Sequence, residues 1–71
     1  MSESVYDFVD LVGTSEVSWD DAIRKLIEKA SSSLRELRVA EVTRLDVKIR
    51  DGQIAKYRVR VKLSFKYTKA E

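Results

Sequence analysis

The 71-residue chain contains no cysteine, no histidine and no proline, and only two glycines. Without cysteine and histidine it cannot form a disulfide or a zinc cluster. The same absences exclude a Ser-His-Asp triad, a cysteine nucleophile and a histidine base. No motif gathers the remaining Lys, Asp, Glu and Tyr residues, so we expect a protein that is not an enzyme. The sequence also lacks a signal peptide and a membrane-length apolar run, so we expect a cytoplasmic protein that does not bind membranes.

Size and charge point to assembly rather than to a large internal core. Residues 1–71 make a single domain near the size at which one hydrophobic core becomes marginal, so tight packing or oligomerisation must supply stability. The net charge is only +2, yet residues 1–21 contain acidic side chains and no Lys or Arg. An acidic region that meets a basic one, within the fold or between subunits, is one interpretation, and nucleic-acid binding is the other.

A strand and a helix are predicted in the first half of the chain. Residues 4–12 carry apolar side chains on both faces of a strand, and Gly13–Ser15 predicts the turn that ends it. A helix is predicted over residues 19–36, with the Ser18 hydroxyl accepting a hydrogen bond from the backbone N–H of Asp21. The apolar stripe of this helix consists of Trp19, Ala22, Ile23, Leu26, Ala30, Leu34 and Leu37.

Residues 37–67 predict one hairpin of two unusually long strands. From Tyr57 to Tyr67 apolar residues alternate with mostly cationic ones, which is typical of a strand with one buried face. The preceding strand is predicted over residues 38–49. Two strands of about 13 residues are about 40 Å long, whereas a compact domain of this size has a radius of gyration of about 11 Å. The hairpin therefore predicts contacts with other subunits.

The loop of this hairpin is predicted from parity. A three-residue loop at Arg50–Gly52 pairs Val47 with Ala55, so that apolar residues meet. A two-residue Asp-Gly loop would pair Val47 with Lys56 and mix inward and outward residues on one face. We therefore predict the three-residue loop, a type I turn closed by a left-handed glycine.

One helix, about 10 Å wide, covers the middle of such a sheet but not its ends. We expect the overhanging residues Val39, Phe65 and Tyr67 to be buried against other subunits. Trp19 is assigned to the core rather than to a ligand platform, because a tryptophan in the first turn of an amphipathic helix is usually core. Glu41 is predicted to point inward, where it pairs with a cation of another subunit or lines a channel between subunits.

The outward side of the hairpin is strongly basic. Phosphate-rich ligands or nucleic acid are one interpretation; a solvated face, or one neutralised by the acidic region of a neighbouring subunit, is the other. We do not expect nucleic-acid binding, because no aromatic residue lies between the cations on that face. The residues are Arg44, Lys48, Arg50, Lys56, Arg58, Arg60, Lys62 and Lys66, against Asp46.

Six short segments follow one another along nearly the whole chain: Val5–Tyr6, Leu11–Ser15, Ser18–Trp19, Arg38–Val42, Asp51–Gly52 and Lys62–Lys66. This ordered set resembles the dodecin family. The resemblance implies an α+β fold of order β-α-β-β, in which a three-stranded antiparallel sheet wraps around one helix. It also implies a hollow dodecamer of four trimers, in which the basic sheet face could line the lumen.

The resemblance further implies positions for a ligand. Known dodecins bind flavins as stacked pairs at contacts between trimers, where a tryptophan stacks on the flavin ring and a glutamine contacts it. By resemblance the tryptophan position is Val39, close to Glu41, and the glutamine position is Arg58. Valine cannot stack on a flavin ring and arginine lacks the acceptor of an amide, so we expect flavin binding to be weak or lost. The dodecins that lack this tryptophan resemble calcium-binding dodecins. Calcium is therefore a candidate, although the carboxylates Asp10, Glu41 and Asp46 are scattered and no metal site is assigned.

The sequence thus predicts a dodecin-like protein that binds, stores or buffers a small ligand or ion. Val39, Arg58 and Glu41 are its candidate ligand-binding positions, and no cofactor is certain. The alternative is a purely structural self-assembling unit, natural or engineered, without a ligand.

Overall fold

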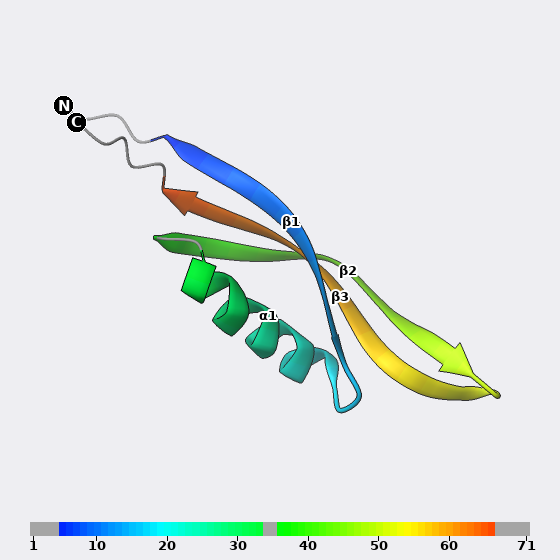
Figure 1. The fold of residues 1–71 in the computed structure, drawn as a ribbon. Coiled ribbons are helices and arrows are strands. Elements are labelled where there is room, and N and C mark those ends of the chain that lie inside the picture. The colour runs from blue at the N-terminus through cyan, green and yellow to red at the C-terminus, as the bar shows by residue number, and fades with distance from the viewer. Residues whose placement is uncertain (1–4, 34–35, 67–71) are drawn as a thin grey trace.

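The structure, a computed structural model, describes residues 5–33 and 36–66. Its elements are β1 (Tyr6–Ser15), α1 (Trp19–Ser33), β2 (Leu37–Arg50) and β3 (Gln53–Lys66). The strands form one antiparallel sheet in the order β1-β3-β2, and α1 lies across one of its faces (Figure 1). The predicted α+β class and the order β-α-β-β are confirmed. In the described residues no helix combines the length and apolar character needed to cross a membrane.

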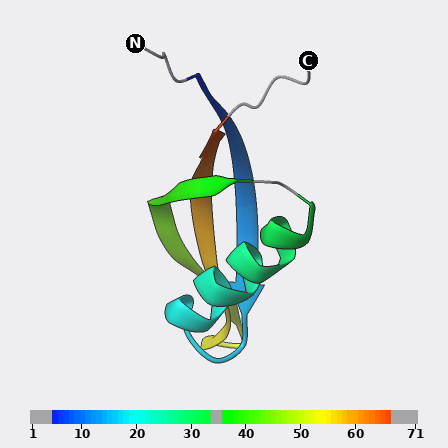
Figure 2. The same cartoon turned by 90° about the vertical axis from the view of Figure 1, so that its left-hand side faces the viewer.

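The core lies between α1 and the central strand β3, which Figure 2 shows running behind the helix. We call the sheet face toward α1 the inner face and the opposite one the outer face. In β3 the alternate residues Val59, Val61 and Leu63 face the helix, as the predicted alternation requires, because neighbouring side chains of a strand point to opposite faces. The buried apolar residues are Ala22, Leu26 and Ala30 of α1 and Val59, Val61 and Leu63 of β3.

Strand β1 is longer than predicted and includes Gly13–Ser15 as paired residues. The prediction of a turn at these residues is wrong. A Cβ built on Gly13 would lie 2.9 Å from Leu26 Cδ1 and 3.1 Å from the carbonyl oxygen of Ala22. Gly13 is therefore needed for the close approach of α1 to β1, not for a turn.

The helix ends earlier than residue 36. Helix α1 is described to Ser33, and Glu36 has a φ of 60°, in the left-handed region that ends many helices. Leu37 belongs to β2, where it packs against the core, rather than to the helical stripe. Leu34, also assigned to that stripe, lies outside the described residues.

The hairpin loop has two residues, so the predicted three-residue loop is wrong. Asp51 and Gly52 have φ values of 53° and 76°, as both central residues of a type I′ turn require. Arg50 and Gln53 pair directly on either side of them. Asp and Gly are the residue types that tolerate this conformation best, and the right-handed twist of the strands favours it.

A bulge in β3 removes the parity conflict that argued against the short loop. The register shifts next to Lys48, which lies opposite Lys56, so that Ala55 is an extra residue. Val47 then lies opposite Tyr57 instead of the predicted Ala55. Apolar residues still meet, because the extra residue returns the two strands to the required parity.

Strand β2 contains two further shifts, and they decide which of its residues face α1. Thr43 is extra between Val42 and Arg44, and Arg38 is extra near the start of the strand. An extra residue moves the side chains before it to the opposite face. Glu41 therefore lies on the outer face and is exposed. The prediction that Glu41 points inward is wrong.

The sheet extends well beyond the helix. The molecule measures 56 × 20 × 14 Å, with a radius of gyration of 14.9 Å, against about 11 Å for a compact chain of this length. At the far end of the hairpin Leu45, Ile49 and Ile54 are 51%, 65% and 52% exposed. We call these three residues the distal apolar cluster. At the other end Val39 is also exposed, Phe65 is half-buried, and Tyr67 lies outside the described residues.

Trp19 connects the helix to the hairpin. Its ring is half-buried against the core, which confirms its assignment. It meets the Tyr57 ring edge-on, with 5.1 Å between centroids and 80° between planes. Its indole N–H donates a hydrogen bond of 3.0 Å to the backbone carbonyl of Asp46. The start of α1 is thereby tied to the middle of β2.

Candidate functional site

The structure places all three predicted ligand-binding residues on the outer face. Val39 lies opposite Ser64, Glu41 opposite Lys62, and Arg58 opposite Asp46. Ser64 and Arg58 are six residues apart along β3, or about 20 Å. One subunit therefore does not bring Val39 and Arg58 together, and a site that uses both needs a second copy of the chain.

Arg58 is held by a carboxylate on the neighbouring strand. Its Nε donates to Asp46 Oδ1 at 2.7 Å, and its Nη2 donates to Oδ2 at 3.0 Å. These hydrogen bonds, together with the positive charge, lower the pKa of Asp46 and raise that of Arg58. The guanidinium of Arg58 is therefore already bound to Asp46 by two hydrogen bonds. Because both carboxylate oxygens of Asp46 accept from Arg58, Asp46 is a weaker candidate for a calcium ligand than the sequence suggested.

Asp10 and Glu41 flank a single lysine. Lys62 of β3 lies opposite Asp10 of β1 on one side and opposite Glu41 of β2 on the other. The two edge strands of a three-stranded sheet are about 10 Å apart, whereas calcium binds oxygen ligands about 2.3–2.6 Å from the ion. Within the described ranges no three acidic, His or Cys residues form a potential metal-binding group. A calcium site on this face would need carboxylates from further copies.

An aromatic residue does accompany the cations. The ammonium of Lys62 lies 5.7 Å from the centre of the Phe8 ring, and Phe8 of β1 is 61% exposed. The expectation of no nucleic-acid binding rested on the absence of aromatic residues between the cations of the hairpin; Phe8 comes from β1 and adds an aromatic ring beside them. The strand order β1-β3-β2 is the reason, because it places β1 beside the basic strand β3. The expectation itself stays a prediction.

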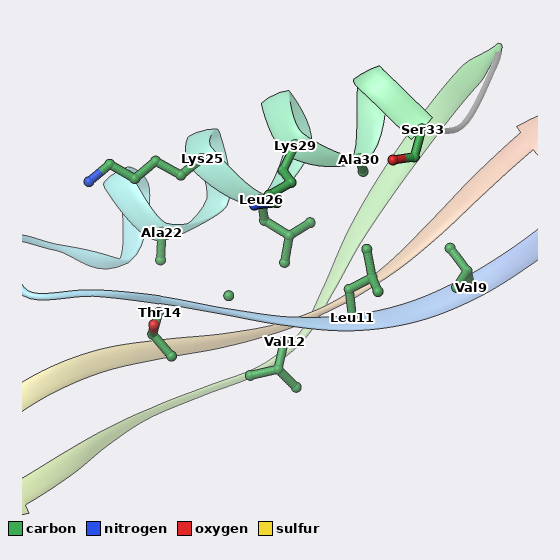
Figure 3. Close-up of a pocket in the computed structure, with 11 residues that line it drawn as sticks. Val9, Leu11, Val12, Thr14, Ala22, Lys25, Leu26, Lys29, Ala30 and Ser33 are labelled. Carbon is green, nitrogen blue, oxygen red and sulfur yellow. The ribbon is translucent and has the colours of Figure 1, made fainter.

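An apolar groove of about 510 Å³ lies between α1 and the edge strand β1. Figure 3 shows Ala22, Leu26 and Ala30 on the side of α1 that faces β1, where Val9 and Leu11 lie opposite the helix. The sequence did not predict this groove. The sequence feature that could have indicated the groove is the small size of Gly13, Ala22 and Ala30. In the sequence, however, the two alanines look like ordinary members of an apolar helical stripe.

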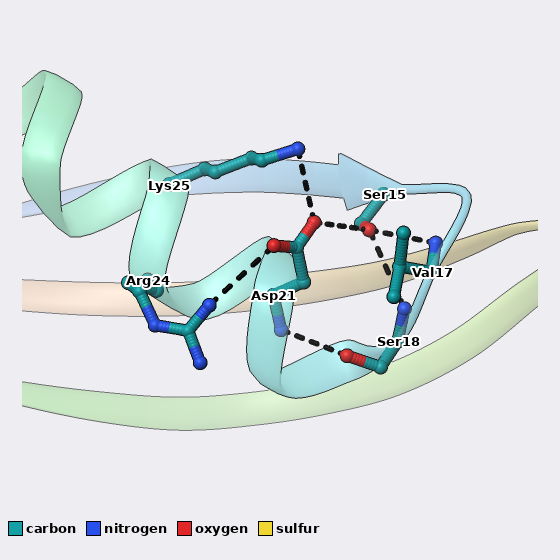
Figure 4. A network of polar contacts seen from close by, with 6 residues as sticks. All are labelled: Ser15, Val17, Ser18, Asp21, Arg24 and Lys25. Atoms are coloured by element: carbon teal, nitrogen blue, oxygen red, sulfur yellow. Dashed lines mark hydrogen bonds and ion pairs between the residues drawn. The ribbon is translucent and has the colours of Figure 1, made fainter.

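A hydrogen-bond network fixes the start of α1 to the end of β1 (Figure 4). The buried Ser15 hydroxyl donates to Asp21 Oδ2 at 2.6 Å and accepts from the Val17 N–H at 2.9 Å. The Ser18 hydroxyl accepts from the Asp21 N–H at 3.0 Å, which confirms the predicted N-cap. The hydrogen bond from Ser15, followed by that from Lys25, lowers the pKa of Asp21. This network sets the position of α1 over the sheet.

Comparison with known proteins assigns the family. Residues 5–68 match the Dodecin family. The chain is 34% identical over 68 residues to a calcium dodecin of Mycobacterium tuberculosis, covering 96% of each protein. The dodecin of Streptomyces coelicolor is 38% identical, with a TM-score of 0.92 over 99% of this chain and all of that one. A structure of the M. tuberculosis calcium dodecin, described as calcium-chelating with a novel calcium-binding site, has a TM-score of 0.82 at 32% identity, over 96% of this chain and 97% of that one. The chain belongs to the dodecin family.

Proposed function

We propose that this protein is a non-enzymatic dodecin whose ligand sites form where copies of the chain meet in a hollow dodecamer of four trimers. The observation that carries this proposal is the distal apolar cluster. Each of its three residues is more than half exposed in one subunit, although each lies in a strand whose pattern is that of a buried face. Covering apolar area of this kind is worth about 25 cal/mol per Å², so association of copies is favoured.

The ligand is a small molecule or ion, and flavin is not the preferred one. Val39 offers no ring for stacking, and Arg58 is bound to Asp46. Because Val39 and Arg58 lie about 20 Å apart along the sheet, a flavin-type cleft would also need the two-fold contact of an assembly. Calcium is the first ion to test, because a relative with the same fold is a calcium dodecin.

A gain-of-function experiment tests the position of the cleft. The unchanged protein should run as a dodecamer in size-exclusion chromatography with light scattering and should not strongly quench riboflavin fluorescence. The double variant Val39→Trp/Arg58→Gln should quench it. Val12→Trp is the matched control, since Val12 is equally exposed on the same face, and it should not. Strong quenching by the unchanged chain, or a monomer in light scattering, would contradict the proposal.

Calcium binding is tested by calorimetry on chelator-treated protein, with magnesium as the competing ion. We expect saturable binding of calcium that Glu41→Gln weakens at least tenfold. Glu28→Gln, at an exposed position on α1, removes the same charge away from the sheet and should leave binding unchanged. Absence of binding heat with calcium would exclude the calcium assignment while leaving the assembly intact.

A further inference from the structure

The outer face carries its charges in cross-strand rows, and the row at Arg60, which we call the unbalanced row, holds cations without a carboxylate, as does the pair Lys48 and Lys56 nearer the hairpin loop. Residues directly opposite one another on adjacent strands are close neighbours, and like charges there are destabilising. Arg60 of β3 lies opposite Arg44 of β2 on one side and opposite Val12 of β1 on the other. This row therefore has two guanidinium groups and no carboxylate.

The two adjacent rows contain carboxylates of their own. In the row toward the hairpin loop, Asp46 accepts two hydrogen bonds from Arg58. In the row on the other side, Lys62 lies between Asp10 and Glu41, so this row has one carboxylate more than cations. Within residues 5–33 and 36–66, neither Arg44 nor Arg60 forms an ion pair. The carboxylates nearest to the unbalanced row are already engaged or lie beside a cation of their own.

The unbalanced row borders two hollows in the sheet surface. One, of about 260 Å³, is lined by Asp10, Thr43, Arg44, Arg60 and Lys62. The other, of about 90 Å³, is lined by Val12, Arg44, Asp46, Arg58, Val59 and Arg60. Arg44 and Arg60 line both. The extra residue Thr43 fixes this point of the sheet, because its hydroxyl donates to the Arg60 carbonyl at 3.1 Å. The two arginines thus stand on an anchored part of the backbone.

We propose that Arg44 and Arg60 form a binding site for a tetrahedral, doubly charged oxyanion, the phosphate group of a small molecule or free phosphate. Guanidinium groups match the oxygens of a phosphate with paired N–H donors. A phosphate between Arg44 and Arg60 replaces the repulsion between the two guanidinium groups with two charge-assisted hydrogen-bonding contacts. Lys62 adds a third cation at the edge of the larger hollow. All of these residues belong to one subunit, so the site does not depend on the proposed assembly.

The test is a ³¹P NMR titration with inorganic phosphate on the complete chain, at constant ionic strength set with chloride. We expect a saturable shift of the phosphate signal. Arg44→Gln and Arg60→Gln should each weaken phosphate binding at least tenfold. Arg44→Lys keeps the charge but loses the paired N–H donors of the guanidinium, so its affinity should lie between those of the unchanged chain and Arg44→Gln. Lys48→Gln is the matched control: it removes the same charge from the same face of β2, four residues or about 13 Å away, and should change binding less than twofold.

Circular dichroism of each variant establishes that it is folded, and Arg44→Lys provides a folded comparison if an Arg→Gln variant is not. A parallel titration with glycerol 3-phosphate separates the two sources of the anion: equal affinity indicates free phosphate, and tighter binding of the ester indicates a phosphorylated small molecule. The proposal is overturned if no saturable shift occurs at constant ionic strength, or if Lys48→Gln weakens binding as much as Arg60→Gln. Light scattering on the same samples reports the assembly separately.

Discussion

The part of the sheet beneath α1 and the far end of the β2–β3 hairpin have the same alternation of apolar and polar residues but opposite surroundings. Leu63 is 1% exposed under the helix, whereas Leu45, Ile49 and Ile54 are more than half exposed at the far end. The helix is 15 residues long and the hairpin strands have 14 residues each; at about 1.5 and 3.3 Å per residue the helix spans only half the length of a strand. Alternation therefore defines a face that must be covered, but not whether the cover comes from the same chain.

The largest expected effect tests this difference directly. Leu63→Ala should lower the free energy of unfolding by about 3 kcal/mol, because it leaves a cavity in the closed core. The loss should be the same at low and high protein concentration in urea unfolding. Leu45→Ala removes the same atoms at the far end, and its effect should depend on protein concentration, because in the proposed assembly other copies cover that residue.

If Leu45→Ala changed the stability by less than about 0.5 kcal/mol at every concentration, as at an ordinary surface position, the far end would be solvated rather than covered. Light scattering on the same variant gives an independent result, since loss of a contact between copies should reduce the assembled fraction.

The two glycines extend the comparison from side chains to the backbone. Gly13→Ala places a methyl group 2.9 Å from Leu26 Cδ1 and should cost about 1–3 kcal/mol, because α1 must move away from β1. Gly52→Ala meets no atom within 4 Å and should cost only about 1 kcal/mol, for a non-glycine residue in the left-handed region. Thermal unfolding of both variants measures the difference. A neutral Gly13→Ala would show that the helix is not closely seated on β1.

Residue periodicity predicted the elements well and their relative register poorly. The Ser18 cap, the alternation of β3 and the part of the helix stripe from Trp19 to Ala30 are local patterns, and each agrees with the structure. Bulges leave no such mark, because Thr43 and Ala55 are ordinary strand residues in the sequence. Each bulge nevertheless changes the pairing of all residues beyond it. The inward placement of Glu41 failed for this reason.

The candidate site was predicted only in part for the same reason. Val39 and Arg58 were placed by resemblance, but their separation along the outer face follows from the pairing with Ser64 and Asp46. The opposition of Arg44 and Arg60 requires the register after Thr43, which no composition or spacing reveals. The basic character of the outer face could be read from the sequence, whereas the assignment of its carboxylates to particular cross-strand rows could not.

The smallest effect compares two carboxylates with lowered pKa values, Asp21 at the start of α1 and Asp46 on the outer face of the hairpin. A carboxyl group whose pKa is lower in the folded state than its ordinary value of 3.8 stabilises the fold above that value. This stability is lost as the pH falls through the folded pKa. The Asp21 side chain is 17% exposed and that of Asp46 is 36% exposed, so solvent should screen the Asp46 pair more strongly.

We therefore expect unfolding stability to fall as the pH is lowered below about 4, and Asp21→Asn to flatten this decline more than Asp46→Asn does. Urea unfolding at a series of pH values measures both slopes. The physical reason is that Asp21 accepts from the buried Ser15 hydroxyl as well as from Lys25, while, among the described residues, the Asp46 carboxylate accepts hydrogen bonds from the exposed Arg58 alone and gains only a smaller contribution from the charge of Arg44. Equal flattening by the two variants would mean that the ion pair on the open sheet contributes as much as the network that seats the helix. The contrast between the enclosed and the open part of the molecule would then not extend to its charges.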